Sequence, residues 1–337
     1  NMPEMDGVEL IRRFGQTGFK GGLILMSGAG AQVLSTASTL AVLQGLRVLG
    51  HVQKPVTPAQ MTVLLSGALE APVQRHPAWS LPEVSPEAIR QGLAKKEFSI
   101  WFQPKVDTVT LKPTGVEALA RWRLSDGSFV PPDIFITVAE REGLIAELSQ
   151  LLVALAFRDG AKLHQAGFPL KIAVNLSGVW LDDLNLPDFV LNTAKQVNLQ
   201  AKDIILEVTE TGVMSDVTTA LDVLTRLRLK GFGLSIDDFG IGYSSFEQLG
   251  RIPFTEMKLD RAFVCRGIQD SAARAILESS MDMAHKLGLS RVAEGVETQA
   301  DLDLVRSLDC NNVQGYLIAR PMPVEDLIVW LGNEEKA

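Results

Sequence analysis

The sequence predicts an α/β protein whose larger part is a parallel barrel of alternating strands and helices. From about residue 85 onward, short apolar runs recur between amphipathic segments, the pattern of buried parallel strands alternating with helices. Seven of these runs lead into a polar side chain, and the C-terminal ends of parallel barrel strands meet on one face. The chain has 337 residues, more than the roughly 250 that a barrel needs, so we expect a smaller N-terminal segment as well.

Residues 1–70 are expected to form this smaller α/β segment. From the N-terminus, the pattern predicts a helix, a strand, a helix, a strand and a further helix, at residues 8–14, 23–26, 33–43, 46–52 and from 57 onward. Pro58 suits the start of the last helix, because proline is tolerated at the first helical position. We interpret the proline-rich residues 71–84 as an interdomain linker, residues 85–332 as the barrel domain and residues 333–337 as a polar tail.

Three markers in the first segment resemble the second half of a response-regulator receiver domain. They are the Met-Pro pair at residues 2–3, Ser27 after one predicted strand, and Lys54 with Pro55 after the next. The resemblance implies a flavodoxin-like segment, a sensor histidine kinase as partner, Ser27 as the hydroxyl that contacts the phosphoryl group, and Lys54 as its charge partner. The Asp that this family phosphorylates would precede residue 1, so we expect no phosphorylation switch in the segment as written. The alternative is an ordinary α/β turn with a helix-capping serine and a surface lysine.

Composition argues against several classes of function. The formal net charge of −8 disfavours non-specific binding to nucleic acid polymers, which needs a basic surface. Cys265 and Cys310 have no paired spacing, so neither a disulfide framework nor a zinc site is expected. Residues 21–46 carry no charge, but their Ser, Gly, Thr and Gln residues interrupt the apolar run and argue against a membrane span. With no signal peptide recognisable, we expect a cytoplasmic protein.

The polar residues that follow the predicted barrel strands are acids, two amides and a lysine. They are Glu117, Asn175, Glu207, Asp237 with Asp238, Lys258, Glu294 and Gln314. Each alone is weak evidence, because a single acid in such a place is more often solvated or part of a turn. Crowded at one rim, however, buried like charges need a cation.

The type of ligand selects Mg²⁺ or Mn²⁺, because all the candidate donors are oxygens. None of the four histidines follows a strand in this set, so a zinc hydrolase is disfavoured. Lys258 is a point charge suited to holding an anionic oxygen or a water, and Arg121 can hold a phosphate in forked geometry. Together these residues indicate phosphoester hydrolysis by a two-metal route.

Eight motifs, in order along residues 85–331, resemble those of the EAL phosphodiesterases, which hydrolyse cyclic di-GMP. They are Gln103-Pro104, Glu117-Ala118-Leu119, Asn175-Leu176-Ser177, Glu207-Val208-Thr209-Glu210, Asp237-Asp238-Phe239-Gly240, Lys258-Leu259-Asp260, Ala293-Glu294-Gly295-Val296-Glu297-Thr298 and Gln314-Gly315-Tyr316. The resemblance implies a modified TIM-like (β/α)8 barrel with one antiparallel strand, and hydrolysis of cyclic di-GMP to the linear dinucleotide pGpG.

The resemblance also implies a role for each matching residue. Two ions, Mg²⁺ or Mn²⁺, would be bound, the first by Glu117, Asn175, Glu207 and Asp237, the second by Asp237, Asp238 and Glu294. Glu294 would serve either as this ligand or as general base, and Lys258 would orient the attacking water. The substrate groove would be lined by Gln103, Leu119, Arg121, Asp260, Glu297, Gln314 and Tyr316.

The loop that follows Asp238 is expected to regulate the site. In residues 239–246, Phe239 leads into Gly240 and Gly242, which permit movement, and Glu210 would tether the loop. The alternative is that Glu210 only caps the following helix. Two residues depart from the family pattern, Ile241 in the loop and Ile318 near the C-terminus; they concern loop dynamics and packing rather than chemistry.

Two functions are compatible with the resemblance, an active phosphodiesterase and a non-catalytic cyclic di-GMP receptor. Relatives that have become receptors have usually lost an acid or the lysine, and here none is missing, which favours the enzyme. We also expect the chain to form a homo-oligomer.

Overall fold

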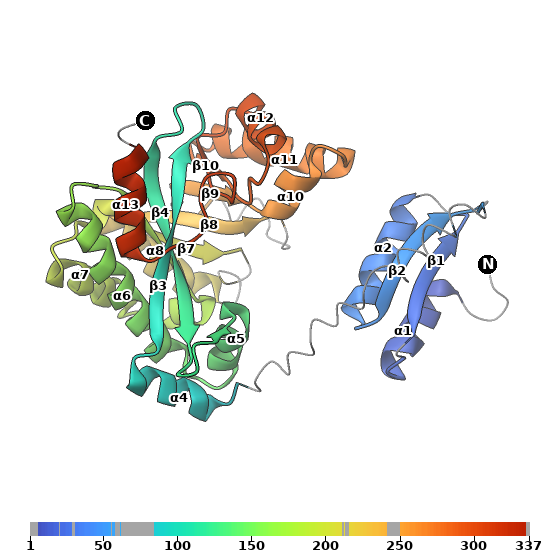
Figure 1. The fold of residues 1–337 in the computed structure, drawn as a ribbon, viewed down its shortest axis with the longest axis horizontal. Coiled ribbons are helices and arrows are strands. Elements are labelled where there is room, and N and C mark those ends of the chain that lie inside the picture. Colours follow the sequence, from blue (N-terminus) through green and yellow to red (C-terminus); the bar gives the residue numbers. More distant parts are fainter. Residues whose placement is uncertain are drawn as a thin grey trace. The chain divides into compact units, whose positions relative to one another are not determined.

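In the computed structural model the chain divides into two compact units, residues 1–82 and 83–337 (Figure 1). The structure describes residues 6–19, 21–28, 31–54, 56–57, 61, 84–210, 212, 216–240 and 250–334. Several predicted features therefore lie outside the described residues: the Met-Pro pair at 2–3, Pro55, Pro58, nearly all of the linker, Ile241, Gly242 and the end of the polar tail.

The described part of the N-terminal unit contains a two-stranded parallel sheet and two helices. Strand β1 (Gly22–Ser27) pairs with β2 (Arg47–Gln53), and the helices are α1 (Gly7–Gln16) and α2 (Ala31–Leu43). Asp6 caps α1, because its carboxylate accepts a hydrogen bond from the Glu9 backbone N–H at 2.8 Å. Ile11, Ala41 and Leu46 form a small buried core. All four elements lie within two residues of their predicted bounds.

The C-terminal unit is built around a closed barrel of eight strands. They are β3 (Phe98–Asp107), β4 (Pro113–Arg123), β6 (Lys171–Leu176), β7 (Ile204–Thr209), β8 (Gly233–Phe239), β9 (Glu256–Leu259), β10 (Ser290–Ala293) and β11 (Asn312–Val313). The sheet runs β3-β11-β10-β9-β8-β7-β6-β4 and closes where β3 pairs with β4. Strand β3 is antiparallel to both neighbours and the other barrel pairings are parallel, which confirms the predicted TIM-like barrel with one antiparallel strand.

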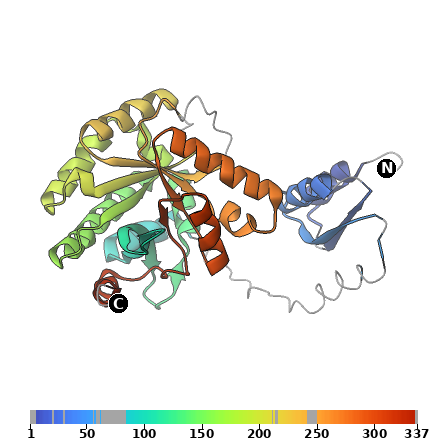
Figure 2. The same ribbon diagram turned by 90° about the horizontal axis from the view of Figure 1, so that it is seen from above.

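Helices cover the outside of the ring of strands (Figure 2). They are α4 (Pro86–Lys95), α5 (Pro132–Arg141), α6 (Ile145–Gln165), α7 (Leu186–Gln196), α8 (Val217–Leu229), α10 (Arg261–Arg266), α11 (Ser271–Lys286), α12 (Gln299–Ser307) and α13 (Val324–Glu334), with short 3-10 turns η1 (Gly178–Asp182) and η2 (Ala201–Asp203). Strand β5 (Phe129–Val130) extends β4 outside the barrel. None of the helices in the described ranges combines the length and apolarity needed to cross a membrane.

Glu117 lies in the middle of a strand, whereas the apolar residue before it predicted a strand end. Strand β4 continues to Arg123, because its second half pairs with antiparallel β3 and with β5 instead of turning into a helix. In this register Glu117 faces Gln103 on β3 and Ala173 on β6. The carboxylate nevertheless reaches the same site as the other predicted acids.

Candidate active site

The predicted acids converge on the buried ammonium group of Lys258. Its Nζ lies 2.6 Å from Glu294 Oε1, 3.0 Å from Glu207 Oε2, and 3.4 Å from both Glu117 Oε2 and Asp237 Oδ1. The Lys258 side chain is 1% exposed, so these four carboxylates replace water as its partners. One cation among four acids leaves a net negative site.

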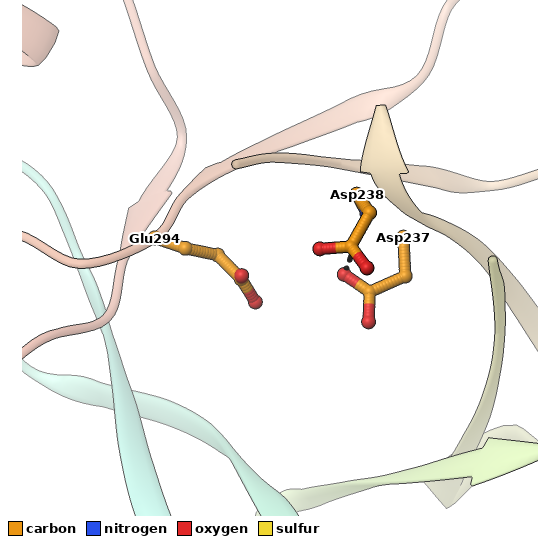
Figure 3. A group of neighbouring side chains, drawn as sticks. All are labelled: Asp237, Asp238 and Glu294. Atoms are coloured by element: carbon orange, nitrogen blue, oxygen red, sulfur yellow. Dashed lines mark hydrogen bonds between the residues drawn. The ribbon is translucent and has the colours of Figure 1, made fainter. Parts of the chain in front are cut away.

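A local distortion of β8 brings two consecutive aspartates to this site. Side chains alternate between the faces of a regular strand, so Asp237 and Asp238 would normally point apart. The β8–β9 register shifts between Ile236 and Phe239, and Asp238 adopts a positive φ of 53°. One carboxylate oxygen from each of Asp237, Asp238 and Glu294 therefore lies within 4.8 Å of the others. Figure 3 shows Glu294 extending toward the two aspartates from a facing strand end.

Burial and repulsion keep several of these carboxyl groups from ionising easily. Burial raises the pKa of Glu294 to about 8, although Lys258 opposes the shift. Burial and the charge of Asp237 raise the pKa of Asp238 to about 6. Burial also raises the pKa of Glu207 well above its usual value. Each raised pKa is a free-energy cost that a bound divalent cation would relieve.

Glu117 and Lys258 are held in their charged forms. Burial would raise the pKa of Glu117, but Lys258 and hydrogen bonds from the amides of Gln314 and Asn175 lower it overall. Burial would lower the pKa of Lys258, but the surrounding carboxylates, Glu117 first, raise it well above its usual value. The site thus combines a fixed cation with carboxyl groups of different proton affinity.

The polar side chains around Glu117 form a fixed network. Asn175 Nδ2 donates to Glu117 Oε1 at 3.0 Å, and Gln314 Nε2 donates to Glu117 Oε2 at 2.5 Å. Gln314 also reaches Gln103 Oε1 at 3.1 Å. In contrast, Glu207 Oε1 is buried without a hydrogen-bond partner. An orphaned carboxylate oxygen inside an all-oxygen cluster fits a hard divalent cation such as Mg²⁺ or Mn²⁺.

A pocket of about 260 Å³ opens beside the acids, and most of the predicted groove residues line it. Its lining comprises Gln103, Glu117, Leu119, Asp237, Arg261, Glu294, Gly295, Glu297, Gln314, Gly315 and Tyr316. Two predicted groove residues do not line it: Arg121, which donates to the Ala120 carbonyl at 2.8 Å, and Asp260, which caps α10 by accepting from Ala262 N–H at 2.7 Å.

Arg261 lines the pocket but is not among the predicted groove residues. It lies directly after Asp260, in the first position of α10, and its Nη2 pairs with Glu297 Oε1 at 2.8 Å. The guanidinium lines the pocket because α10 lies beside the segment that follows β10, which carries Glu297. Its position next to the Lys258-Leu259-Asp260 motif is the one sequence feature that could have suggested it.

Glu210 holds the end of β8, where the predicted regulatory loop begins. Its Oε2 accepts a hydrogen bond from Gly240 N–H at 3.2 Å, and its own N–H donates to the Asp237 carbonyl at 3.3 Å. The cap of the following helix, α8, is Asp216, whose carboxylate accepts from Thr218 and Thr219. These two hydrogen bonds attach Glu210 to the end of β8.

In the N-terminal unit, Ser27 and Lys54 lie next to each other. Ser27 ends β1, Lys54 follows β2, and the Lys54 N–H donates to the Ser27 carbonyl at 2.8 Å. The two receiver-like markers are thus at the C-terminal ends of adjacent parallel strands, where ligand sites of open α/β sheets are usually found.

The sequence of this chain matches a protein family model and several curated proteins. Residues 86–321 match the family model of the EAL domain. The chain is 33% identical over 331 residues to the cyclic di-GMP phosphodiesterase RocR of Pseudomonas aeruginosa, and the match covers 97% of this chain and 84% of RocR. It is 38% identical over 241 residues to the bifunctional diguanylate cyclase/cyclic di-GMP phosphodiesterase MucR of the same species, covering 71% of this chain but 35% of MucR. The chain spans less than half the length of several other curated relatives as well.

Solved structures match the barrel unit too. The MucR phosphodiesterase in complex with c-di-GMP superposes with a TM-score of 0.69 at 38% identity, over 72% of this chain and 98% of that one. The EAL enzyme Bd1971, bound to cAMP and cyclic di-GMP, gives a TM-score of 0.70 at 26% identity, over 73% of this chain and 67% of that one.

Proposed function

The chain belongs to the EAL domain family, and on that premise we propose that it hydrolyses one phosphodiester bond of cyclic di-GMP to give linear pGpG. One observation carries the proposal: Lys258 lies within 3.4 Å of four carboxylates beside an open pocket. RocR and MucR, which are named for this activity, support the choice of substrate. A fold alone does not decide function, so the intact set of acids and lysine is the decisive support.

The donors of this site fit two divalent ions. Asp237, Asp238 and Glu294 would hold one, since their oxygens already lie within 4.8 Å of one another. Glu117, Asn175 and Glu207, with Asp237, would hold the other. Bound Mg²⁺ or Mn²⁺ would lower the pKa of a water and offset charge on the phosphate oxygens.

The residues of the chain would divide the remaining tasks of hydrolysis. The Lys258 ammonium would hold the attacking water in line with phosphorus, and a carboxylate would accept its proton. Glu294 is placed for this role, or for that of a metal ligand, because its Oε1 lies 2.6 Å from Lys258 Nζ, the group that would hold the water. The new water–phosphorus bond forms as one ester P–O bond breaks, and the released ester oxygen takes up a proton. The pocket would hold the dinucleotide in place.

Hydrolysis of added cyclic di-GMP tests the proposal directly. We expect pGpG to form with Mg²⁺ or Mn²⁺ and to be suppressed by EDTA. Ca²⁺ should inhibit, because its larger and looser ligand shell misplaces the water. Equal turnover in EDTA would contradict the metal mechanism. Tight binding of cyclic di-GMP without any hydrolysis would instead support the receptor alternative.

A substitution at Glu294 tests its role within the same site. Glu294→Ala should lower turnover by about a hundredfold or more, whether Glu294 is ligand or base, and should leave the fold intact because the side chain lies at the rim. Titration with Mn²⁺ separates the two roles, since only loss of a ligand weakens metal binding. Glu278→Ala, at a surface ion pair of α11, is the matched control and should change neither quantity. A Glu294→Ala variant that retained most of the wild-type rate would refute both roles.

We also propose that the N-terminal unit is receiver-like and takes its input from a sensor histidine kinase. The adjacency of Ser27 and Lys54 supports this, as does the similarity to RocR over 97% of the chain. A chimera with the first half of a known receiver joined ahead of residue 1 tests it with acetyl phosphate. A change in hydrolysis that needs Lys54 would support the assignment, and no change would contradict it.

The predicted homo-oligomer is tested by sedimentation velocity.

A further inference from the structure

A second pocket lies at the opposite end of the barrel from the active site. Its volume is about 400 Å³, and its lining comes from the starts of the strands. Lys171 is the first residue of β6, Gly233 of β8 and Glu256 of β9, and Lys202 lies in η2 just before β7. The active-site residues Asn175, Glu207, Asp237 and Lys258 lie further along the same strands, toward their C-terminal ends. The two pockets are therefore separate sites at the two mouths of one barrel.

This pocket is strongly cationic in a chain whose formal net charge is −8. Four basic residues line it: Lys105, Lys171, Lys202 and Arg228. Among the described lining residues Glu256 is the one acid, and it is bound to Lys105 at 2.7 Å with both side chains buried. Within the described ranges no carboxylate lies within ion-pair distance of Lys171, Lys202 or Arg228. Three positive charges thus line the pocket without a carboxylate partner among the described residues, and Arg228 also donates an N–H to the Phe232 carbonyl.

The floor and one wall of the pocket are fixed by hydrogen bonds. The buried Lys105–Glu256 pair closes the floor. Thr114 Oγ1 is 2.8 Å from Asn312 Oδ1, and Asn312 Nδ2 reaches Ser290 Oγ at 3.4 Å, so the polar wall is held before any ligand arrives. A preorganised polar wall beside several cations suits an anion, because fewer side chains have to be ordered on binding.

We propose that the N-terminal mouth of the barrel binds a small anion with adjacent phosphoryl groups, that is, a diphosphate. A single phosphate monoester carries about two negative charges at neutral pH, so the third cation is matched only when a second phosphoryl group is present. The pocket volume of about 400 Å³ accommodates more than one such group. Arg228 offers forked donors, and Lys171 and Lys202 offer mobile point charges from two other segments.

Calorimetric titration of the full chain with inorganic pyrophosphate tests the site. EDTA is kept present, so that no metal at the catalytic end recruits the probe. We expect saturable binding with one site per chain, and weaker binding of inorganic phosphate. The double variant Lys171→Gln, Lys202→Gln should weaken pyrophosphate binding by at least roughly tenfold, because two charge-assisted contacts are lost. It should retain hydrolysis of cyclic di-GMP, which shows that the variant is folded.

Lys95→Gln with Lys195→Gln is the matched control, since both are exposed helix lysines that do not line this pocket. Its pyrophosphate affinity should equal that of the wild type. Absence of saturable pyrophosphate binding to the wild type would overturn the proposal. Equal weakening in the control pair would overturn it too, because the effect would then reflect net charge alone. Phosphate that binds as tightly as pyrophosphate would refute the diphosphate assignment.

Discussion

At the scale of single residues, Lys258 sets the charge balance of the active site. Methionine at this position would keep most of the volume but leave four buried carboxylates without a cation. Their repulsion then favours a bound metal ion. We expect Lys258→Met to bind Mn²⁺ roughly tenfold more tightly than the wild type, while hydrolysis falls about a hundredfold or more because the water is no longer oriented.

Calorimetry with Mn²⁺, beside a hydrolysis assay, measures both effects of Lys258→Met. The control is Lys286→Met, an exposed lysine paired with Asp282 at 2.6 Å, which should change neither affinity nor rate. If Mn²⁺ bound more weakly to Lys258→Met, Lys258 would be a support for the metal site and not its competitor.

The raised pKa values of the acids make metal binding depend on pH. In the metal-free fold, Asp238 has a pKa of about 6 and Glu294 of about 8, so at lower pH a metal ion must displace their protons. Apparent Mn²⁺ affinity should therefore increase from about pH 5 to about pH 9, with protons released on binding. Titrations in two buffers of different ionisation enthalpy count these protons. A flat affinity across this range would contradict the assignment of these carboxyls as ligands.

Sequence alone predicts the members of the acid cluster better than the walls of the pocket. Glu207, Asp237 and Lys258 each follow an apolar run, and a run of that kind is visible without any structure. Whether a neighbouring side chain faces the pocket depends on the other hydrogen-bonding groups within its reach. Arg121 donates to a backbone carbonyl and Asp260 caps a helix. The spacing of residues in the sequence predicts neither of these hydrogen bonds.

At the scale of elements, the distortion of β8 is what makes two adjacent aspartates usable at one site. Periodicity predicts the strand but not the positive φ at Asp238, because Asp is compatible with both hands of the backbone. Gly240 also has a positive φ, of 101°, and a Cβ at this position would lie 2.9 Å from the Phe263 ring. Glycine is therefore the residue that fits here. The positions of the proposed metal ligands Asp237 and Asp238 therefore depend on this irregular backbone at the end of β8.

Glu210 ties this segment to β7, so its removal should disturb the metal ligands from outside the site. Glu210→Ala removes the acceptor of the Gly240 N–H, and a displacement of about 1 Å at Asp237 or Asp238 can cost a large factor in rate. We expect hydrolysis to fall roughly tenfold and the Mg²⁺ concentration for half activation to increase. Mg²⁺ activation curves measured beside thermal melts give both quantities.

Asp216→Ala is the control for Glu210→Ala, because Asp216 caps α8 through Thr218 and Thr219. It should lower the melting temperature, with a cost of about 1 kcal/mol in the free energy of unfolding, and leave Mg²⁺ activation unchanged. If Glu210→Ala behaved in the same way, its role would be structural.

At the scale of the whole molecule, the alternation of apolar runs predicts the barrel but not how it closes. Closure depends on β3, which pairs antiparallel with β4 and with β11. Strand direction leaves no mark in an apolar run, so the antiparallel strand could be expected only from the family resemblance. The same pairing extends β4 past Glu117, which is why the predicted strand end there was wrong.

The closed barrel should fold and act without the N-terminal unit. Closure removes open sheet edges, and the barrel unit has core clusters of its own, drawn from residues 84–331. We therefore expect a fragment of residues 84–337 to melt cooperatively and to hydrolyse cyclic di-GMP within about twofold of the full chain's rate, as for a domain that has its own core. Calorimetric melts and the hydrolysis assay measure this. Aggregation of the fragment, or loss of its activity in the presence of Mg²⁺, would show that residues 1–83 complete the barrel unit.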